Sequence, residues 1–189
     1  MEAKLGQQPS ACIKIVLFGP ESTGKTTLSQ QLARHYNSVW VPEYARDYLQ
    51  KKWNNERLTC ETKDLLPIAI GQMKLENELA QKTNSVLICD TDLLETKVYS
   101  EAYYAGTCDP ILEKYAIKNQ YDLYFLTYID VPWLADDLRD KPHERERMFK
   151  AFEKALIDYN KPYILLKGTK KERLDRAIIE IDKLLKHKA

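Results

Sequence analysis

The residues best suited to chemistry form one short stretch that begins at Gly19. Gly19, Gly24, Lys25 and Thr26 occupy the fixed positions of the P-loop pattern G-x-x-x-x-G-K-[ST]. Two glycines let the backbone turn tightly, so that successive N–H groups face one anion. Lys25 can then reach the β- and γ-phosphates of ATP, and the Thr26 hydroxyl can ligate a bridging Mg²⁺. The predicted phosphate-binding residues are Gly19, Glu21, Ser22, Thr23, Gly24, Lys25, Thr26 and Thr27.

The segments on either side of this stretch support a nucleotide site. Ile13 to Phe18 is apolar and rich in β-branched residues, which predicts a buried strand. After the loop, Leu28 and Leu32 fall at helical spacing, which predicts a helix to about Tyr36. The start of a helix adds partial positive charge and free N–H groups to a phosphate site. A chance turn of Gly, Ser and Thr would lack this context.

A pair of acidic residues follows the apolar run that begins at Ser85. Asp90 ends this run, at the place where an acid beside a P-loop strand can hold Mg²⁺. Asp92, two residues further on, can face the acceptor substrate and act on its hydroxyl. The alternative for Asp92 is structural, because an acid before Leu93 can cap the helix that we expect there.

Another polar group follows the short apolar run that Pro42 ends. Glu43 can orient a substrate hydroxyl or accept its proton. Tyr44 offers a face for stacking, and Arg46 can stabilise a transferred phosphoryl group. The structural alternatives are an acid that favours a helix N-terminus and a tyrosine in the core.

The segment from 132 to 147 is dense in charge. Arg139, Arg145 and Arg147 are candidates for closing on the γ-phosphate and neutralising developing charge. The alternative is a solvated face with local salt bridges to neighbouring acids. Trp133 is either a core residue or an aromatic wall for a flat ring.

Strands and helices alternate along the chain, which predicts an α/β fold with a parallel sheet covered on both faces. Ligands of such sheets bind at the carboxyl ends of the strands, and the polar groups described above follow predicted strands. A short helix is expected from Glu43, then a loop-rich segment at 53–61, and Pro67 should lie in the first turn of its helix. Residues 1–10 should be a flexible tail before a single domain at 11–189. The other expected elements are strands at 38–41, 85–90, 123–129 and 162–166 and helices near 66–81, 93–104, 110–117, 148–159 and 169–188.

Composition limits the classes of partner. The 189 residues carry a formal net charge of +1, so no long-range field favours nucleic acid or anionic lipid. Four cysteines lie far apart without a C-x-x-C pair, which argues against a zinc site or a disulfide framework and fits a reducing cytoplasm. No stretch approaches eighteen continuous apolar residues, so we expect neither a membrane span nor export.

Taken together, these motifs resemble the nicotinamide riboside kinase domain of NadR-type proteins. The resemblance rests on the P-loop with Glu21, on Glu43 to Tyr48, on Asp90-Thr91-Asp92 and on Trp133 to Arg139, and it extends over about 13–166. It implies a P-loop kinase-type three-layer sandwich, a five-stranded parallel sheet in the order 2-3-1-4-5, and a helical lid. One departure is Pro42, because members of this family tend to have Trp directly before Glu-Tyr.

The resemblance also implies a reaction, in which the γ-phosphoryl group of ATP moves to the 5′-hydroxyl of nicotinamide riboside and gives nicotinamide mononucleotide. Lys25 and Thr26 would bind phosphate and metal, Asp90 would serve Mg²⁺, and Glu43 and Asp92 would face the riboside. Either carboxylate could be the base. Two alternatives stay open, namely a kinase for another nucleoside or nucleoside monophosphate, and a nucleotide-dependent regulatory switch. The sequence does not indicate an oligomeric state.

Overall fold

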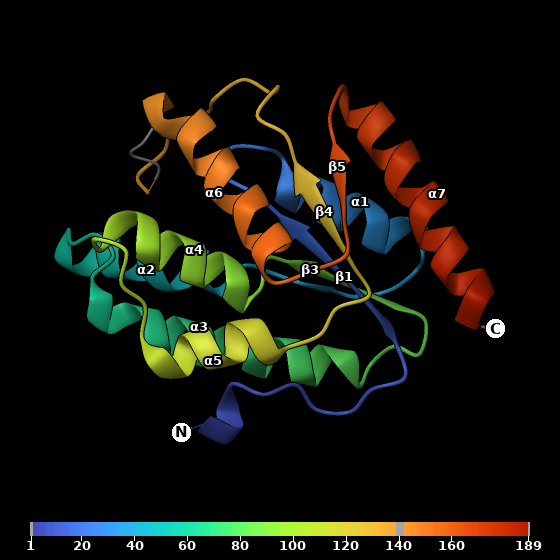
Figure 1. Cartoon of the computed structure of the whole chain (residues 1–189), viewed down its shortest axis with the longest axis horizontal. Helices are drawn as coiled ribbons and strands as arrows, with labels where there is room; N and C mark the ends of the chain where they lie inside the picture. Colours follow the sequence, from blue (N-terminus) through green and yellow to red (C-terminus); the bar gives the residue numbers. More distant parts are fainter. Residues whose placement is uncertain (1, 139–141, 189) are drawn as a thin grey trace.

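The computed structural model describes residues 2–138 and 142–188, and its centre is a parallel sheet (Figure 1). The strands lie in the order β2-β3-β1-β4-β5, which confirms the predicted order 2-3-1-4-5. The central strand β1 pairs with β3 on one side and β4 on the other, so the strand that ends in Asp90 lies beside the P-loop strand. The strands are β1 (Ile13–Phe18), β2 (Trp40–Val41), β3 (Val86–Asp90), β4 (Leu123–Thr127) and β5 (Tyr163–Leu166).

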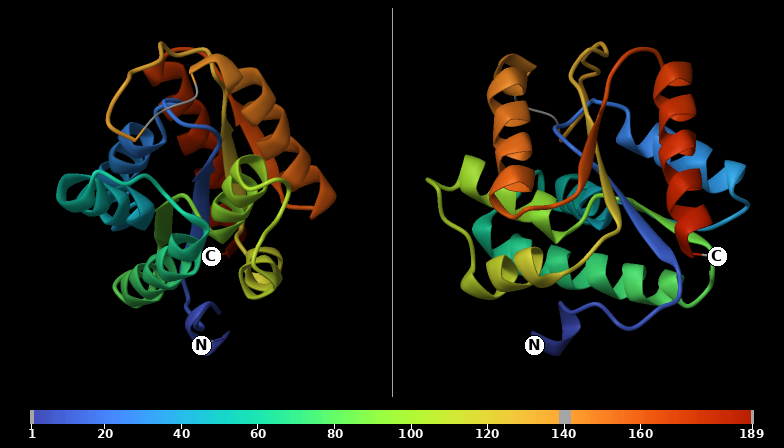
Figure 2. Two further views of the ribbon diagram at one scale, coloured as in Figure 1. Left: turned by 90° about the vertical axis from the view of Figure 1, so that its left-hand side faces the viewer. Right: turned by 45° about the vertical axis from the view of Figure 1, so that its right-hand side comes forward.

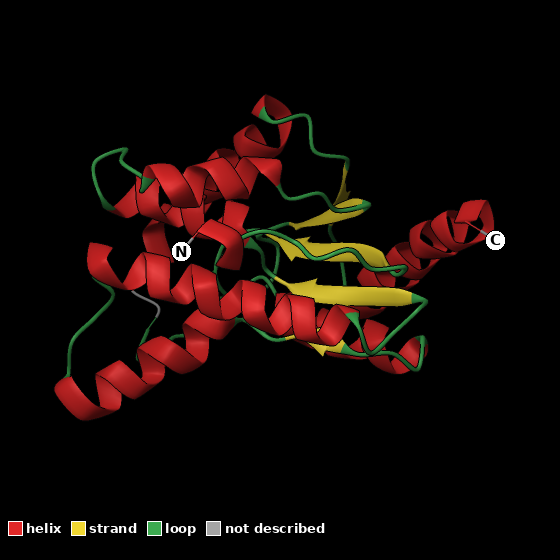
Figure 3. Ribbon diagram, turned by 90° about the horizontal axis from the view of Figure 1, so that it is seen from below, coloured by secondary structure: helices red, strands yellow, loops and turns green. Residues whose placement is uncertain are grey.

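Helices cover both faces of the sheet and complete the three layers (Figures 2 and 3). Alternate residues of β1 serve the two faces, because side chains along a strand point to opposite sides. Ile15 and Leu17 pack toward α1 (Lys25–His35) and α7 (Lys170–Lys188). Val16 and Phe18 pack in the core on the opposite face. The helices of that face are α3 (Thr62–Ala80), α4 (Leu93–Tyr103), α5 (Pro110–Lys118) and α6 (Arg145–Asp158).

Two helices differ from the sequence prediction around residues 43–66. Helix α2 (Tyr44–Glu56) extends well beyond the short helix expected, so the loop in the 53–61 segment is limited to residues 57–61. Helix α3 begins at Thr62 rather than near Leu66, because Glu61 and Asp64 form a reciprocal capping box at its start. Pro67 consequently lies inside the helix and not in its first turn. In the described ranges no helix is both long and apolar enough to span a membrane.

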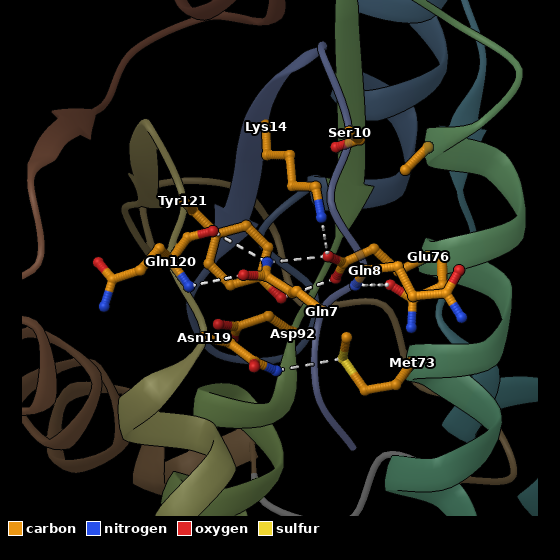
Figure 4. Close-up of polar contacts among 12 residues, drawn as sticks. Gln7, Gln8, Ser10, Lys14, Met73, Glu76, Asp92, Asn119, Gln120 and Tyr121 are labelled. Carbon is orange, nitrogen blue, oxygen red and sulfur yellow. Dashed lines mark hydrogen bonds and ion pairs between the residues drawn. The ribbon is translucent and has the colours of Figure 1, made fainter. Parts of the chain in front are cut away.

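Residues before β1 are packed against the body of the domain (Figure 4). Leu5 is fully buried, and the Gln7 side-chain amide donates to Glu76 at 2.9 Å. The buried Glu76 also forms an ion pair of 2.9 Å with Lys14 and accepts from the Tyr121 hydroxyl at 2.7 Å. A charge removed from water needs such partners. The flexible tail expected at residues 1–10 is therefore a docked segment over much of its length in this structure.

Candidate active site

One large cleft, with a volume of about 1290 Å³, lies along the carboxyl ends of the strands. It is lined by the P-loop after β1, by the segments that follow β2, β3 and β4, and by the loop between β5 and α7. Side chains from separate loops converge at this edge because all five strands run in the same direction. Every predicted phosphate-binding residue from Glu21 to Thr27 lines this cleft.

The conformation of the P-loop is fixed by its glycines and by β4. Gly19 has φ 137° and Gly24 has φ 85°, which residues with a Cβ rarely adopt. A Cβ on Gly19 would also lie only 2.8 Å from the Thr127 hydroxyl of β4. The Thr23 hydroxyl lies 2.7 Å from the same hydroxyl and donates to Pro20 O at 2.8 Å. The loop is thus held in one defined shape.

The Lys25 ammonium lies at the base of the cleft, buried among oxygen atoms. It donates to the carbonyl oxygens of Gly19 at 2.5 Å and Pro20 at 3.0 Å. It also forms an ion pair of 3.1 Å with Glu95. Burial alone would lower the pKa of Lys25, but the surrounding carboxylates, Glu95 foremost, raise it. A permanent positive charge is therefore fixed beside the loop.

Glu95 is a site residue that the sequence did not reveal. It lies in the first turn of α4, is 3% exposed and lines the cleft. Burial, opposed by Lys25, raises the pKa of Glu95 to about 8. Because Glu95 follows Asp92 by three residues, its spacing is typical of a capping box. Nothing in the sequence separates it from an ordinary capping glutamate.

Asp90 has the features of a metal ligand. Its side chain is 1% exposed, and within the described chain neither carboxylate oxygen has a hydrogen-bond partner. Burial and the charge of Glu43 raise the pKa of Asp90 to about 6, against the opposing charge of Lys25. The described residues contain no cluster of three or more His, Cys, Asp or Glu able to hold a metal. Since Mg²⁺ is usually held by one or two carboxylates together with substrate phosphates, Asp90 and Thr26 fit this ion.

Asp92 does not take the place expected for it beside the acceptor. It is 1% exposed, its Oδ1 accepts from the Glu95 N–H at 3.1 Å, and its Oδ2 accepts from the Tyr124 hydroxyl at 2.7 Å. Burial raises the pKa of Asp92 to about 7. The backbone after β3 turns this side chain into the core, where it caps α4. The structural alternative, a cap for α4, is what the structure shows, and Asp92 is not among the described residues that line the cleft.

Glu43 is a carboxylate that the structure presents on the β2 side of the cleft, where Asp47 of α2 also lines it. Glu43 lines the cleft from the N-cap position of α2, and in the described structure its side chain does not cap the helix. Its charge acts on the pKa values of Lys25 and Asp90, which places it near the P-loop. Arg46, in the first turn of α2, also lines the cleft and pairs with Asp136 at 2.6 Å. This ion pair joins α2 to the segment after β4.

The aromatic lining of the cleft differs from the prediction. Neither Tyr44 nor Trp133 is among the described residues that line the cleft. The Tyr44 ring packs over α3, where a Cβ on Gly71 would lie only 2.2 Å from it. Trp133 stacks instead on Arg145, whose guanidinium lies 5.7 Å from the ring centre. The aromatic residues that do line the cleft are Trp40, Tyr99, Tyr103 and Tyr104.

Arg145 links the segment after β4 to the P-loop. Its guanidinium donates to Val131 O at 2.9 Å and to the P-loop carbonyl of Ser22 at 3.3 Å. The Ser22 hydroxyl in turn accepts from the Leu134 N–H at 2.8 Å. Burial lowers the pKa of Arg145. Of the described candidates for the lid, Arg145 is the one held against the phosphate loop.

Arg147, unlike Arg145, does not join the site in the described structure. Arg147 forms an exposed ion pair with Glu144 at 2.8 Å, in agreement with the solvated-face alternative. Arg139 lies outside the described residues. Before α6, the described part of this segment contains the 3-10 helix η2 (Pro142–Glu144), so the helical lid stays a prediction.

Arg173 of α7 is a second cleft residue that the sequence did not mark. It is only 5% exposed, and its guanidinium donates to three carbonyl oxygens, those of Thr23 at 2.7 Å, Tyr128 at 2.9 Å and Gly168 at 3.0 Å. It also pairs with Asp130. One guanidinium thereby fastens the P-loop to the ends of β4 and β5. In the sequence Arg173 stands in a run of charged residues, so no pattern distinguishes it.

Sequence comparisons place the chain near proteins of NAD metabolism. Residues 14–173 match a family described as an AAA domain. The trifunctional NAD biosynthesis/regulator protein NadR of Salmonella typhimurium is 29% identical over 144 residues, which cover 76% of this chain and 34% of the relative. The chain therefore spans about a third of the length of this curated relative.

Solved structures with the same fold include kinases. A crystal structure of NadR protein in complex with NR matches with a TM-score of 0.75 at 22% identity, over 92% of this chain and 52% of the other. Thymidylate kinase from Candida albicans matches with a TM-score of 0.64 at 14% identity, over 96% of both chains. At these identities the likeness establishes a P-loop kinase fold.

Proposed function

This chain belongs to the AAA domain family, with the fold of P-loop kinases, and from that premise we propose that it phosphorylates nicotinamide riboside. The γ-phosphoryl group of ATP would pass to the 5′-hydroxyl, giving nicotinamide mononucleotide and ADP. The observation that carries the proposal is that the P-loop, Asp90 and Glu43 line the same cleft. Homology to NadR, together with a structure of NadR in complex with NR, supports the choice of acceptor.

On the nucleotide side, the chain's own groups bind phosphate and fix its position. The P-loop N–H groups and the Lys25 ammonium bind the β- and γ-phosphates. Asp90 and Thr26 would hold Mg²⁺, which when bound neutralises charge that develops on the transferring group. Arg145 keeps the segment after β4 against the loop and limits the entry of water. Arg173 holds the loop from the other side.

On the acceptor side, Glu43 orients the 5′-hydroxyl and accepts its proton as the new bond forms. Asp92 is engaged in the core, so Glu43 takes the role that the sequence left open between the two carboxylates. A pyridinium ring carries positive charge, which nearby carboxylates and aromatic faces attract. Trp40, Tyr99 and Tyr103 supply such faces in the cleft. These features favour a cationic riboside over a substrate that already carries phosphate.

A melting-shift screen tests the choice of acceptor. Ligand at about a hundred times its dissociation constant adds roughly 2.7 kcal/mol to stability. At ~2–4 °C per kcal/mol, this is a shift of about 5–10 °C for a domain of this size. We expect nicotinamide riboside to give the largest shift in a panel with ribonucleosides, deoxyribonucleosides and their monophosphates. A monophosphate that shifts the melting temperature while nicotinamide riboside does not would contradict the proposal.

A further inference from the structure

We propose that Gln72, together with Gly71, is a positioning residue that holds Glu43 in the cleft. The inference rests on the proposed function, because Glu43 matters only if the acceptor binds beside it. Gln72 lies on α3, outside every motif that the sequence analysis identified, and is 2% exposed. It lines the same cleft as Glu43.

The Gln72 amide binds the backbone on both sides of Glu43. Its Oε1 accepts from the Tyr44 N–H at 2.8 Å, and its Nε2 donates to Pro42 O at 3.3 Å. Tyr44 is the first residue of α2, so its N–H is among those that a helix leaves without an internal partner. Gln72 therefore supplies a cap for α2 from another helix. Glu43 is the residue between the two bonded peptide groups.

A carboxamide satisfies both bonds at once. Pro42 has no N–H and offers only a carbonyl oxygen, while Tyr44 offers an N–H donor. One side chain must therefore accept and donate at once, which the two ends of a glutamine amide do. An ionised glutamate would only accept, and its charge would face both Pro42 O and Glu43. A methionine of similar length would make neither bond.

Gly71 completes the clamp from the neighbouring position on α3. A Cβ at Gly71 would lie 2.2 Å from Cε1 and 2.3 Å from Cζ of Tyr44. The ring can approach α3 this closely only because residue 71 has no side chain. Hydrogen bonds and close packing thus fix Pro42 and Tyr44, the two neighbours of Glu43. The backbone that positions the Glu43 carboxylate is therefore held in place by α3.

The kinetic test compares Gln72→Met with Gln81→Met in the whole chain. Gln81 is the C-cap residue of α3, and its side-chain amide donates to the Pro9 carbonyl oxygen at 3.0 Å. Like Gln72, it therefore bonds a backbone carbonyl, but it lies far along the helix from Glu43. We expect Gln72→Met to lower kcat for riboside phosphorylation by about 10²-fold, the scale of a small misplacement of a reacting group. The KM for ATP should not change, and Gln81→Met should match the wild type.

A double-mutant cycle with Glu43→Gln then separates positioning from general damage. If Gln72 acts through Glu43, Gln72→Met should cause no further loss in the Glu43→Gln background. Losses that multiply, or a Gln72→Met enzyme with normal kcat, would overturn the proposal. Gly71→Ala provides an independent variant, expected to lower kcat even though alanine is the better helix former.

Amide hydrogen exchange at Tyr44 tests the clamp without any substrate. The Tyr44 N–H should exchange slowly in the wild type and in Gln81→Met, and roughly two- to tenfold faster in Gln72→Met, since one hydrogen bond is lost. Equal exchange in the three proteins would refute the clamp. A protected Tyr44 in a protein that phosphorylates no riboside would instead refute the proposed function and leave the clamp in place.

Discussion

Replacing Asp92 should damage the fold and spare the chemistry. Asp92→Ala removes the acceptor that caps α4, which typically costs about 1 kcal/mol. It also leaves the buried Tyr124 hydroxyl without its 2.7 Å partner, at a cost of roughly 1–3 kcal/mol. Together these losses are about 3 kcal/mol, or roughly 6–12 °C in melting temperature for a chain of this size.

Asp92→Asn is the matched variant. At pH 6 a carboxyl group with a pKa of about 7 is mostly neutral, and asparagine resembles that form. Its Oδ1 can still cap α4, because asparagine is among the best N-cap residues, so we expect a loss below about 1 kcal/mol. The folded protein holds the Asp92 proton more tightly than the unfolded chain does. Raising the pH from about 5 to about 8 should therefore lower the stability of the wild type relative to Asp92→Asn.

Thermal melts and steady-state kinetics on the same preparations decide the matter. Both variants, assayed well below their melting temperatures, should turn over within a few-fold of the wild type. A stable Asp92→Asn protein whose kcat falls by about 10² or more, the scale of a lost general base, would show that Asp92 acts on the substrate after all. An unchanged melting temperature for Asp92→Ala would refute the capping argument.

Three further predictions concern the cleft. Lys25→Met should reduce phosphoryl transfer by roughly 10²–10³ without unfolding the chain, because it removes the charge beside the phosphates; a near-normal rate would contradict this. Arg145→Ala should lose at least about tenfold in kcat, since its bond to the P-loop disappears. Arg147→Ala loses only an exposed ion pair and should change kcat little. Equal losses of kcat in the two variants would argue against a special role for Arg145. Of these two described cysteines, Cys60 lines the cleft and Cys108 does not. Saturating acceptor should therefore slow the alkylation of Cys60 and leave that of Cys108 unchanged, which peptide mass mapping would measure.

The sequence was sufficient for the P-loop and for the order of the sheet. The strand, glycine-bounded loop and helix around Lys25 are local in sequence, so their pattern predicts their structure directly. The sheet order came from the family resemblance and is confirmed. Helix ends were less predictable. The start of α3 depends on the pairing of Glu61 with Asp64, which the apolar stripe of the helix does not encode.

Choosing among neighbouring polar residues needed the structure. Asp92 and Glu95 are three residues apart, and only the path of the chain after β3 decides which carboxylate enters the cleft. The sequence leaves Tyr44 open between stacking on the substrate and packing in the protein; it packs on Gly71, a contact between helices that no local pattern predicts. Arg173 binds a carbonyl 150 residues away, at Thr23. Such long-range contacts determine which side chains reach the cleft, and the hydrophobic periodicity of the sequence does not indicate them.

The most direct test of the central claim is to identify the product formed from Mg-ATP and nicotinamide riboside. We predict that ADP appears only when the riboside is present, in equal amount to nicotinamide mononucleotide. Glu43→Gln should reduce this transfer by at least about 10², the low end for loss of a general base, while ATP still binds. Release of ADP that is independent of the riboside, or transfer to a nucleoside monophosphate with none to nicotinamide riboside, would contradict the account.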